Sequence, residues 1–425
     1  MTELAMTGGT PVRTKPFPAY KVIGEPEKAA VAKVMESGVL SRFIGGWHKD
    51  FYGGPEVQAF EKEWAETFGA THAVSVNSAT SGLYAACGAA GVGAGDEVIV
   101  SPYTMSASCV APMVYNATPI FADIDPATYC LDPESIRSKI TPNTKAIIVV
   151  HIFGMAADMD PIMEIAAAHD LIVIEDCAQC PFATYKGRPV GTLGHMGVFS
   201  FNYHKHIHTG EGGMITTNND QFAERCQLIR NHAESVVAGK GFTDQTNMIG
   251  FNYRMGEIEA AIGRCQLAKG PALIEARKTN VTYLEAALSE IPGLGMPTTA
   301  PAGDHVYYVH ALGYDPDITD VPVRIMADAL KAELPITELR EGEGALVRAG
   351  YVQPVYSLPI FQTVPGAYPT GLCPMTERAN QRLLIHEFMR PPMSATDLDD
   401  VIAAFTKVFD NLDPLRAIAQ QETAT

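Results

Sequence analysis

The sequence is poor in positive charge and has no apolar run long enough to cross a bilayer. Lysine and arginine total 31 against 48 aspartates and glutamates, which gives a formal net charge of −17. Such an acidic chain is not expected to bind nucleic acid or an anionic membrane. No stretch approaches the roughly 18 apolar residues of a transmembrane helix. A phosphorylated ligand is still compatible with this charge, because backbone N–H groups can hold a phosphate.

Targeting and disulfide signals are also missing. The N-terminal segment MTELAMTGGTPVRTKPFPAY has neither the cationic start nor the apolar stretch of a secretory signal peptide. Eight cysteines scattered over 425 residues are too sparse for a disulfide framework. The sequence therefore predicts a reduced, cytoplasmic protein of two or three structural units with a large core.

Short β-rich runs alternate with helical segments between about residues 57 and 215. Runs such as AIIVV and LIVI are typical of strands buried on both faces. We expect strands at His72–Val76, Glu97–Val100, Pro119–Ile124, Ala146–Val150, Leu171–Ile174, Gly197–Phe201 and Gly213–Thr216. Helices are expected between them at Ser81–Ala90, Met105–Asn116, Pro133–Ile140 and Pro161–His169. This alternation predicts an α/β fold with a mostly parallel sheet, whose ligands lie beyond the carboxyl ends of the strands.

The remaining chain divides into an arm, a connector and a smaller domain. Residues 1–56 form an N-terminal arm that includes a Gly- and aromatic-rich loop at Gly38–Pro55, and residues 57–270 form the large α/β domain. Residues 271–415 hold a connector helix, which begins near Ile258, and a smaller C-terminal α+β domain with helices at Val323–Leu334 and Ala395–Leu412. Residues 416–425 are expected to be a frayed tail.

The densest cluster of chemically useful residues is FSFNYHKHIHTGEGG, residues 199–213. A lysine beside an apolar strand end, such as Lys205, can be desolvated, which frees its amine to attack an aldehyde. Alone, it could equally be a surface lysine beside a turn. On a strand, the alternating His204, His206 and His208 would share one face, as zinc ligands do. The segment is expected to be a loop, and no metal is predicted. One of these histidines could instead meet the substrate.

Two further clusters follow strands. In EDCAQC, residues 175–180, Asp176 either caps a turn or keeps the nitrogen of a pyridine ring protonated, which makes the ring an electron sink. Cys177 and Cys180 form a lone C-x-x-C, which is better explained as core packing than as a redox pair or half a zinc site. In NSATSG, residues 77–82, small and hydroxyl residues precede a helix, so they either cap it or hold an anion at its N-terminus.

In this combination the chain resembles the DegT/DnrJ/EryC1/StrS family of pyridoxal-phosphate-dependent sugar aminotransferases. The resemblance covers roughly residues 20–270 and rests on GGTPVRTKPFP, FGATHAVSVNSATSGL, GAGDEVIVSPYT, PIFADIDPATYCLDP, VHIFGMAADMD, IEDCAQ and the lysine segment. It implies fold type I, the aspartate-aminotransferase architecture: a large α/β domain with a mostly parallel mixed sheet and a smaller C-terminal α+β domain.

The resemblance also implies a role for each matching residue. Lys205 would form the Schiff base with pyridoxal 5′-phosphate and move the proton, and Asp176 would pair with the ring nitrogen. Gln179 would lie near the cofactor hydroxyl. Ser200, Thr80 and the backbone at Ala79 would hold the phosphate. Asn252 in GFNYRM would reach the phosphate bound by a neighbouring subunit, which implies a homodimer with shared active sites.

Two positions depart from the family pattern. Ala79 stands where glycine is usual, and its N–H remains a donor if φ is negative. Met105 stands where an aromatic residue usually stacks on the ring, and a thioether can still pack on a π face.

The expected reaction moves an amino group from glutamate or glutamine to a keto sugar, a nucleotide-linked keto sugar or a keto-cyclitol. Loop chemistry suggests acceptor-site roles for Arg42, Trp47, His48 and Tyr52. His151, after AIIVV, is either another wall residue or a buried core histidine. A sugar dehydratase or a non-catalytic pyridoxal-binding regulator of the same fold is the alternative, and Lys205 favours the aminotransferase.

Overall fold

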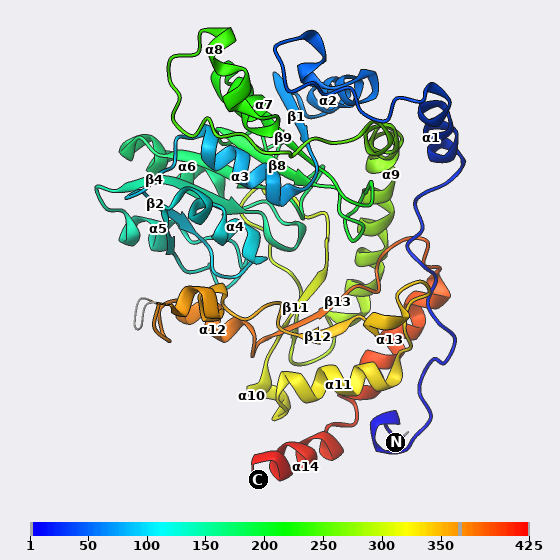
Figure 1. The fold of residues 1–425 in the computed structure, drawn as a ribbon. Helices are drawn as coiled ribbons and strands as arrows, with labels where there is room; N and C mark the ends of the chain where they lie inside the picture. The colour runs from blue at the N-terminus through cyan, green and yellow to red at the C-terminus, as the bar shows by residue number, and fades with distance from the viewer. Residues whose placement is uncertain (1–2, 364–367, 424–425) are drawn as a thin grey trace.

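The computed structural model describes residues 3–363 and 368–423, which form a large α/β domain and a smaller domain connected by one long helix (Figure 1). In this part of the chain, no helix is both long and apolar enough to cross a membrane.

Seven strands form the central sheet in the order β1-β9-β8-β5-β4-β2-β3. They are β1 (His72–Val76), β2 (Glu97–Val100), β3 (Thr118–Phe121), β4 (Thr144–Val150), β5 (Ile172–Asp176), β8 (Met196–Ser200) and β9 (Gly213–Thr217). Pairing is parallel from β3 through β2, β4 and β5 to β8. Strand β9 runs antiparallel to β1 and to β8. The predicted mostly parallel mixed sheet is confirmed, and each expected strand is present.

Helices cover both faces of this sheet. They are α2 (Pro55–Phe68), α3 (Ala79–Ala89), α4 (Ser106–Val110), α5 (Pro133–Lys139), α6 (Met159–His169), α7 (Asp220–Arg230) and α8 (Val237–Lys240), and a small hairpin pairs β6 (Thr184–Tyr185) with β7 (Arg188–Pro189). One apolar cluster packs α2, α5 and α6 on the sheet, and a second packs α3 and α7. The helix expected at Met105–Asn116 is broken into α4 and a 3₁₀ turn at Pro112–Tyr115. Proline has no N–H to continue the α-helical ladder.

The smaller domain is built on α9 (Glu257–Leu288) and a four-stranded antiparallel sheet. Its strands, in sheet order, are β10 (Leu294–Gly295), β11 (His310–Tyr314), β13 (Leu383–His386) and β12 (Val347–Ala349). Its helices are α10 (Pro316–Thr319), α11 (Val323–Glu333), α12 (Pro374–Ala379), α13 (Ala395–Phe409) and α14 (Leu412–Thr423). With 32 residues, α9 is about 48 Å long, which lets one helix contact both domains.

Both ends of the chain lie on the smaller domain (Figure 1). The N-terminal arm runs along the outside of α9, where α1 (Glu25–Ser37) packs, and buries Leu4 and Phe17 in the small-domain core. The expectation of a frayed tail from residue 416 is wrong. Helix α14 continues to Thr423 and packs on α11, because the apolar side of Ile418 and Ala419 has a core to cover.

Candidate active site

A cavity of about 400 Å³ lies where β5 and β8 end, and residues of both domains line it. Asp176 and Ser200 are the last residues of these two strands, and their carboxyl ends meet at one edge of the sheet. Tyr308 and Tyr351 reach the same cavity from the C-terminal part of the chain. Seven of the eight residues predicted to hold the cofactor line it: Ala79, Thr80, Met105, Asp176, Gln179, Ser200 and Lys205.

The first turn of α3 forms one wall of the cavity. Ser78 caps this helix, and its hydroxyl oxygen accepts a hydrogen bond from Ser81 N at 3.0 Å. Ala79 is the first helical residue, so alanine fits there without a positive φ. Gly213 lets β9 start directly against this turn, because a Cβ there would lie 2.7 Å from the carbonyl carbon of Ser78. The N–H groups of a helix start lack intrahelical acceptors and favour an anion such as phosphate.

The Asp176 carboxylate is buried and accepts hydrogen bonds from two groups. Ser108 Oγ, in α4, donates to Oδ2 at 2.6 Å, and Ala178 N donates to Oδ1 at 3.0 Å. Hydrogen bonds to an ionised carboxylate are shorter and stronger than neutral ones. These two bonds therefore hold the charge of Asp176 in one orientation at the cavity wall.

Lys205 lies on a compact turn after β8. Its N–H donates to Asn202 O at 2.9 Å, and Thr209 N donates to Phe201 O at 3.0 Å, which closes the turn. The side chain is half-buried, and Nζ lies 4.4 Å from the centroid of the Tyr308 ring. Within residues 3–363 and 368–423, no carboxylate forms an ion pair with this amine. Lys205 therefore presents an amine to the cavity that Asp176 also lines.

Gln179 and two tyrosines form the wall nearest the smaller domain. Gln179 Oε1 accepts from Phe153 N at 2.7 Å, and its Nε2 donates to the Tyr351 hydroxyl at 2.9 Å. Gly154 allows the backbone of Tyr308 to approach closely. Its φ is +95°, and a Cβ there would lie 2.6 Å from Tyr308 N. The backbone of the smaller domain thus packs directly on the turn after β4.

Comparison with known proteins agrees with this geometry. The sequence pattern of the DegT/DnrJ/EryC1/StrS aminotransferase family matches residues 23–406. The chain belongs to this family. It is 35% identical to the spore coat polysaccharide biosynthesis protein SpsC of Bacillus subtilis, over 92% of this chain and 96% of the relative. It is 33% identical to the L-glutamine:2-deoxy-scyllo-inosose aminotransferase of Streptomyces lividus, over 96% and 97% of the two chains.

A solved structure supports the same assignment. DesI, crystallised in the presence of its TDP-sugar product, superposes with a TM-score of 0.82 at 26% identity and covers 99% of both chains. The fold is therefore that of the type I pyridoxal-phosphate-dependent transferases, as predicted, and the protein is an aminotransferase that depends on this cofactor. The family match extends well beyond residue 270, where the resemblance of the sequence motifs ends.

The residues of this aminotransferase cavity fit pyridoxal phosphate. The helix start and the Ser200 and Thr80 hydroxyls suit the phosphate, the Asp176 carboxylate suits a protonated ring nitrogen, and the Lys205 amine suits the aldehyde. A volume of about 400 Å³ is also in the range of small-molecule sites. Met105 lines the cavity with an exposed side chain, and its sulfur accepts from Ala107 N at 3.1 Å.

The three alternating histidines diverge in the structure. His204 lines the cavity, whereas His206 is fully buried and donates from Nε2 to Val306 O at 2.8 Å. His208 Nδ1 accepts from Gly210 N. Among the described residues, the only three-residue group with metal-ligand spacing is His151, Glu175 and Cys177, and hydrogen bonds already engage its carboxylate.

The C-x-x-C pair is part of the core. Cys177 and Cys180 are fully buried, and burial raises the pKa of both thiols well above the usual value. Since a thiolate is the reactive form, this setting favours packing over redox chemistry.

His151 does not line the cavity, so its assignment as a wall residue is corrected here. The imidazole is fully buried, donates from Nε2 to Glu175 at 2.9 Å and accepts at Nδ1 from Ala157 N at 3.0 Å. Glu175 also accepts from three backbone N–H groups. Both ring nitrogens are therefore used to fix the loops behind the sheet.

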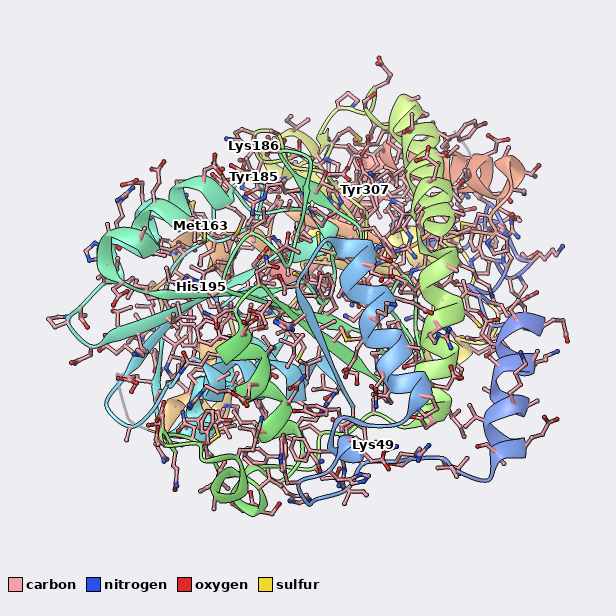
Figure 2. The ribbon with its side chains drawn as sticks, turned by 90° about the horizontal axis from the view of Figure 1, so that it is seen from above. Lys49, Met163, Tyr185, Lys186, His195 and Tyr307 are labelled. Atoms are coloured by element: carbon pink, nitrogen blue, oxygen red, sulfur yellow. The ribbon has the colours of Figure 1, made fainter. Side chains whose placement is uncertain are left out.

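Besides His151, five predicted site residues lie outside the cavity of their own chain: Arg42, Trp47, His48, Tyr52 and Asn252. The loop Gly38–Pro55 contains a 3₁₀ turn at Lys49–Tyr52. In Figure 2, Lys49 of this turn lies across the molecule from Tyr307, the neighbour of Tyr308. Asn231 Nδ2 donates to Ile44 O and Phe51 O, so the loop packs beside the segment that carries Asn252.

Ser108, Tyr308 and Tyr351 are among the residues around the cavity that were not predicted, and the contact of His204 with Arg340 was not predicted either. The serine lies in an ordinary helix, SASCV, and the tyrosines come from segments with no motif. Only contacts between distant parts of the chain reveal them.

Proposed function

We propose that this aminotransferase moves an amino group from glutamate or glutamine to a keto sugar or keto-cyclitol at the Lys205 cavity. The observation that carries the proposal is the placement of the Lys205 amine and the Asp176 carboxylate on one cavity with the start of α3. The named activity of a relative, the amination of a scyllo-inosose, supports the acceptor class.

The bound cofactor would supply an electron sink, which lets a C–H bond beside the transferred nitrogen be broken. In this proposal Lys205 Nζ removes and returns the proton of the C–H bond beside the transferred nitrogen. It is the basic group that faces the cavity without a carboxylate partner. Asp176, fixed by Ser108 and Ala178, would keep the ring nitrogen protonated. Ser200, Thr80 and the N–H of Ala79 would hold the phosphate, and Met105 and Gln179 would contact the ring.

The working unit in this proposal is a homodimer. Asn252 and the loop residues Arg42, Trp47, His48 and Tyr52 share one face of the chain and would complete the site of a second copy. Exposed apolar side chains on this face support the idea: Leu40, Ile44, Trp47 and Ile249 are 46, 45, 48 and 74% exposed. The unpaired state of all eight cysteines supports a reducing, cytoplasmic setting.

Replacement of the lysine tests the function. Purified protein should lose its visible cofactor absorbance on addition of glutamate or glutamine and should aminate members of a keto-sugar panel, read by mass. Lys205→Ala should do neither. Lys186→Ala is the matched control, because Lys186 is an exposed lysine paired with Asp160 on the surface. An unchanged spectrum in the wild type with both donors, or release of a deoxygenated ketone without a donor, would reject the aminotransferase reaction.

A further inference from the structure

Of the three alternating histidines, His204 is the one that lines the Lys205 cavity. It directly precedes Lys205 and also lines an adjoining cavity of about 260 Å³. Two contacts fix its position. The N–H of His204 donates to Asn202 Oδ1 at 3.2 Å, and the centroid of its imidazole lies 3.7 Å from that of the Tyr203 ring. The imidazole is therefore held at the cavity wall beside the lysine amine.

Arg340 determines which nitrogen of this imidazole carries the proton. Its Nη2 lies 2.9 Å from His204 Nδ1. Because a guanidinium can only donate, Nδ1 is the acceptor, and the proton of the neutral ring is on Nε2. Arg340 is itself held by ion pairs with Glu343 and Glu387. A fixed cation thus sets the tautomer of His204.

The Nε2–H group of His204 is available to a ligand. Burial lowers the pKa of His204, and the positive charge of Arg340 lowers it further, so the ring is neutral at neutral pH. Within residues 3–363 and 368–423, no group of the protein accepts a hydrogen bond from Nε2, and this nitrogen is not sealed from solvent. The residue therefore presents one uncharged hydrogen-bond donor beside Lys205.

The charges around the Lys205 cavity favour an uncharged acceptor. Among the described residues that line it, Lys205 is the only lysine or arginine, whereas Asp176 and Glu211 contribute two carboxylates. The phosphate of the cofactor would add further negative charge. The arginines of the adjoining cavity already pair with Glu387. A sugar diphosphate would therefore be repelled here, and an uncharged ketone would not.

We propose that His204 recognises the amino acceptor, with its Nε2–H donating to a hydroxyl oxygen of an uncharged keto-cyclitol or free keto sugar. The inference rests on the proposed aminotransferase function and narrows its acceptor. Such a ketone carries a hydroxyl group beside the carbonyl carbon that receives the nitrogen, so a donor next to Lys205 is placed to reach it. The amino donor offers a carboxylate instead, and the charge of Arg340 is already matched by Glu343 and Glu387.

The test follows the two half-reactions of the cofactor-loaded protein separately, by stopped-flow absorbance. The first uses glutamate or glutamine, and the second uses 2-deoxy-scyllo-inosose, the ketone in the name of the Streptomyces lividus relative. His204→Asn keeps an oxygen near the position of Nδ1 for Arg340 but removes the Nε2 donor. It should slow the second half-reaction at subsaturating ketone about 3- to 10-fold, the range for one uncharged hydrogen bond. The first should stay within about 1.5-fold of wild type.

Two further variants control for packing. His204→Gln places an amide N–H near the position of Nε2 and should recover part of the loss. His195→Asn is the matched control, because His195 is also a half-buried histidine whose Nδ1 accepts a hydrogen bond, from Val173 N at 2.9 Å. It lies at the opposite end of β8 from the site and should leave both half-reactions unchanged.

An unchanged second half-reaction in His204→Asn would overturn the inference. Equal losses in both half-reactions, or a loss that His204→Gln does not reduce, would also overturn it and assign the imidazole a purely structural role. A wild type that reacts with the amino donor but not with 2-deoxy-scyllo-inosose would overturn the assignment of an uncharged acceptor. The proposed function fails on a different result, namely that neither amino donor changes the cofactor absorbance of the wild type.

Discussion

Removal of the Ser108 hydroxyl measures how much its hydrogen bond to Asp176 contributes to kcat/KM. Its hydroxyl donates to Asp176 Oδ2 at 2.6 Å, and both residues are buried. A hydrogen bond to a charged group contributes about 1.5–3 kcal/mol. If this energy acts on the transition state, Ser108→Ala should lower kcat/KM by roughly 10- to 150-fold. The contact of Ala178 N with Oδ1 should keep the carboxylate in place.

The assay is a double-mutant cycle on kcat/KM for glutamine and an accepted keto sugar. Ser108→Ala should add less than about a factor of two when Asp176 is already asparagine, because the two residues act through one contact. Ser138→Ala, in which an exposed hydroxyl that bonds to Ser135 O is removed, is the control and should behave as wild type. Equal losses in both backgrounds would show that Ser108 supports the fold and not Asp176. A loss no larger than that of the control would refute the reasoning as a whole.

Two further predictions concern buried residues where the two domains meet. Tyr351→Phe removes the acceptor of Gln179 Nε2 at a buried site, so the free energy of unfolding should fall by about 1–3 kcal/mol in urea titrations; an unchanged midpoint would mean that the amide finds another partner. His305 is buried with a pKa lowered to about 3, mainly by burial, and burial also lowers the pKa of His206. A lowered folded pKa means that the stability of these neutral histidines is complete above the unfolded pKa of about 6.5 and is lost as the pH falls below it. The Tm should therefore drop from pH 7 to pH 5, and it should drop less in His305→Phe.

The sequence predicted those site residues that follow strands of regular pattern. Asp176, Ser200 and the NSATSG turn each come directly after a β-rich run, and parallel strands bring their carboxyl ends to one edge. The spacing of apolar residues and the length of apolar runs are local properties of the sequence. The boundaries of the strands were therefore predicted to within a few residues. The extent of α14 was missed because its stability depends on packing against α11, which no local pattern contains.

The missed residues share a different physical origin. Tyr308 enters the cavity because the backbone at Val306 and Tyr308 donates to the turn at Phe153–Gly154, more than 150 positions earlier in the chain. Tyr351 is held by the Tyr103 hydroxyl, which accepts from its N–H at 3.0 Å. Such contacts follow from how the domains dock. For the same reason, the sequence could not decide whether His151 was a wall residue or a core residue.

The strand ends of the large domain and the smaller domain therefore contribute different residues to the site. The sheet edge fixes the groups that fit the cofactor, and Asp176 and Lys205 are placed there by the backbone of β5 and β8. The smaller domain contributes Tyr308 and Tyr351, which line the same cavity. Because α9 packs on α2 of the large domain and on α13 of the smaller one, this helix fixes how the two domains dock. The cavity is therefore complete only when the smaller domain is docked on the sheet edge.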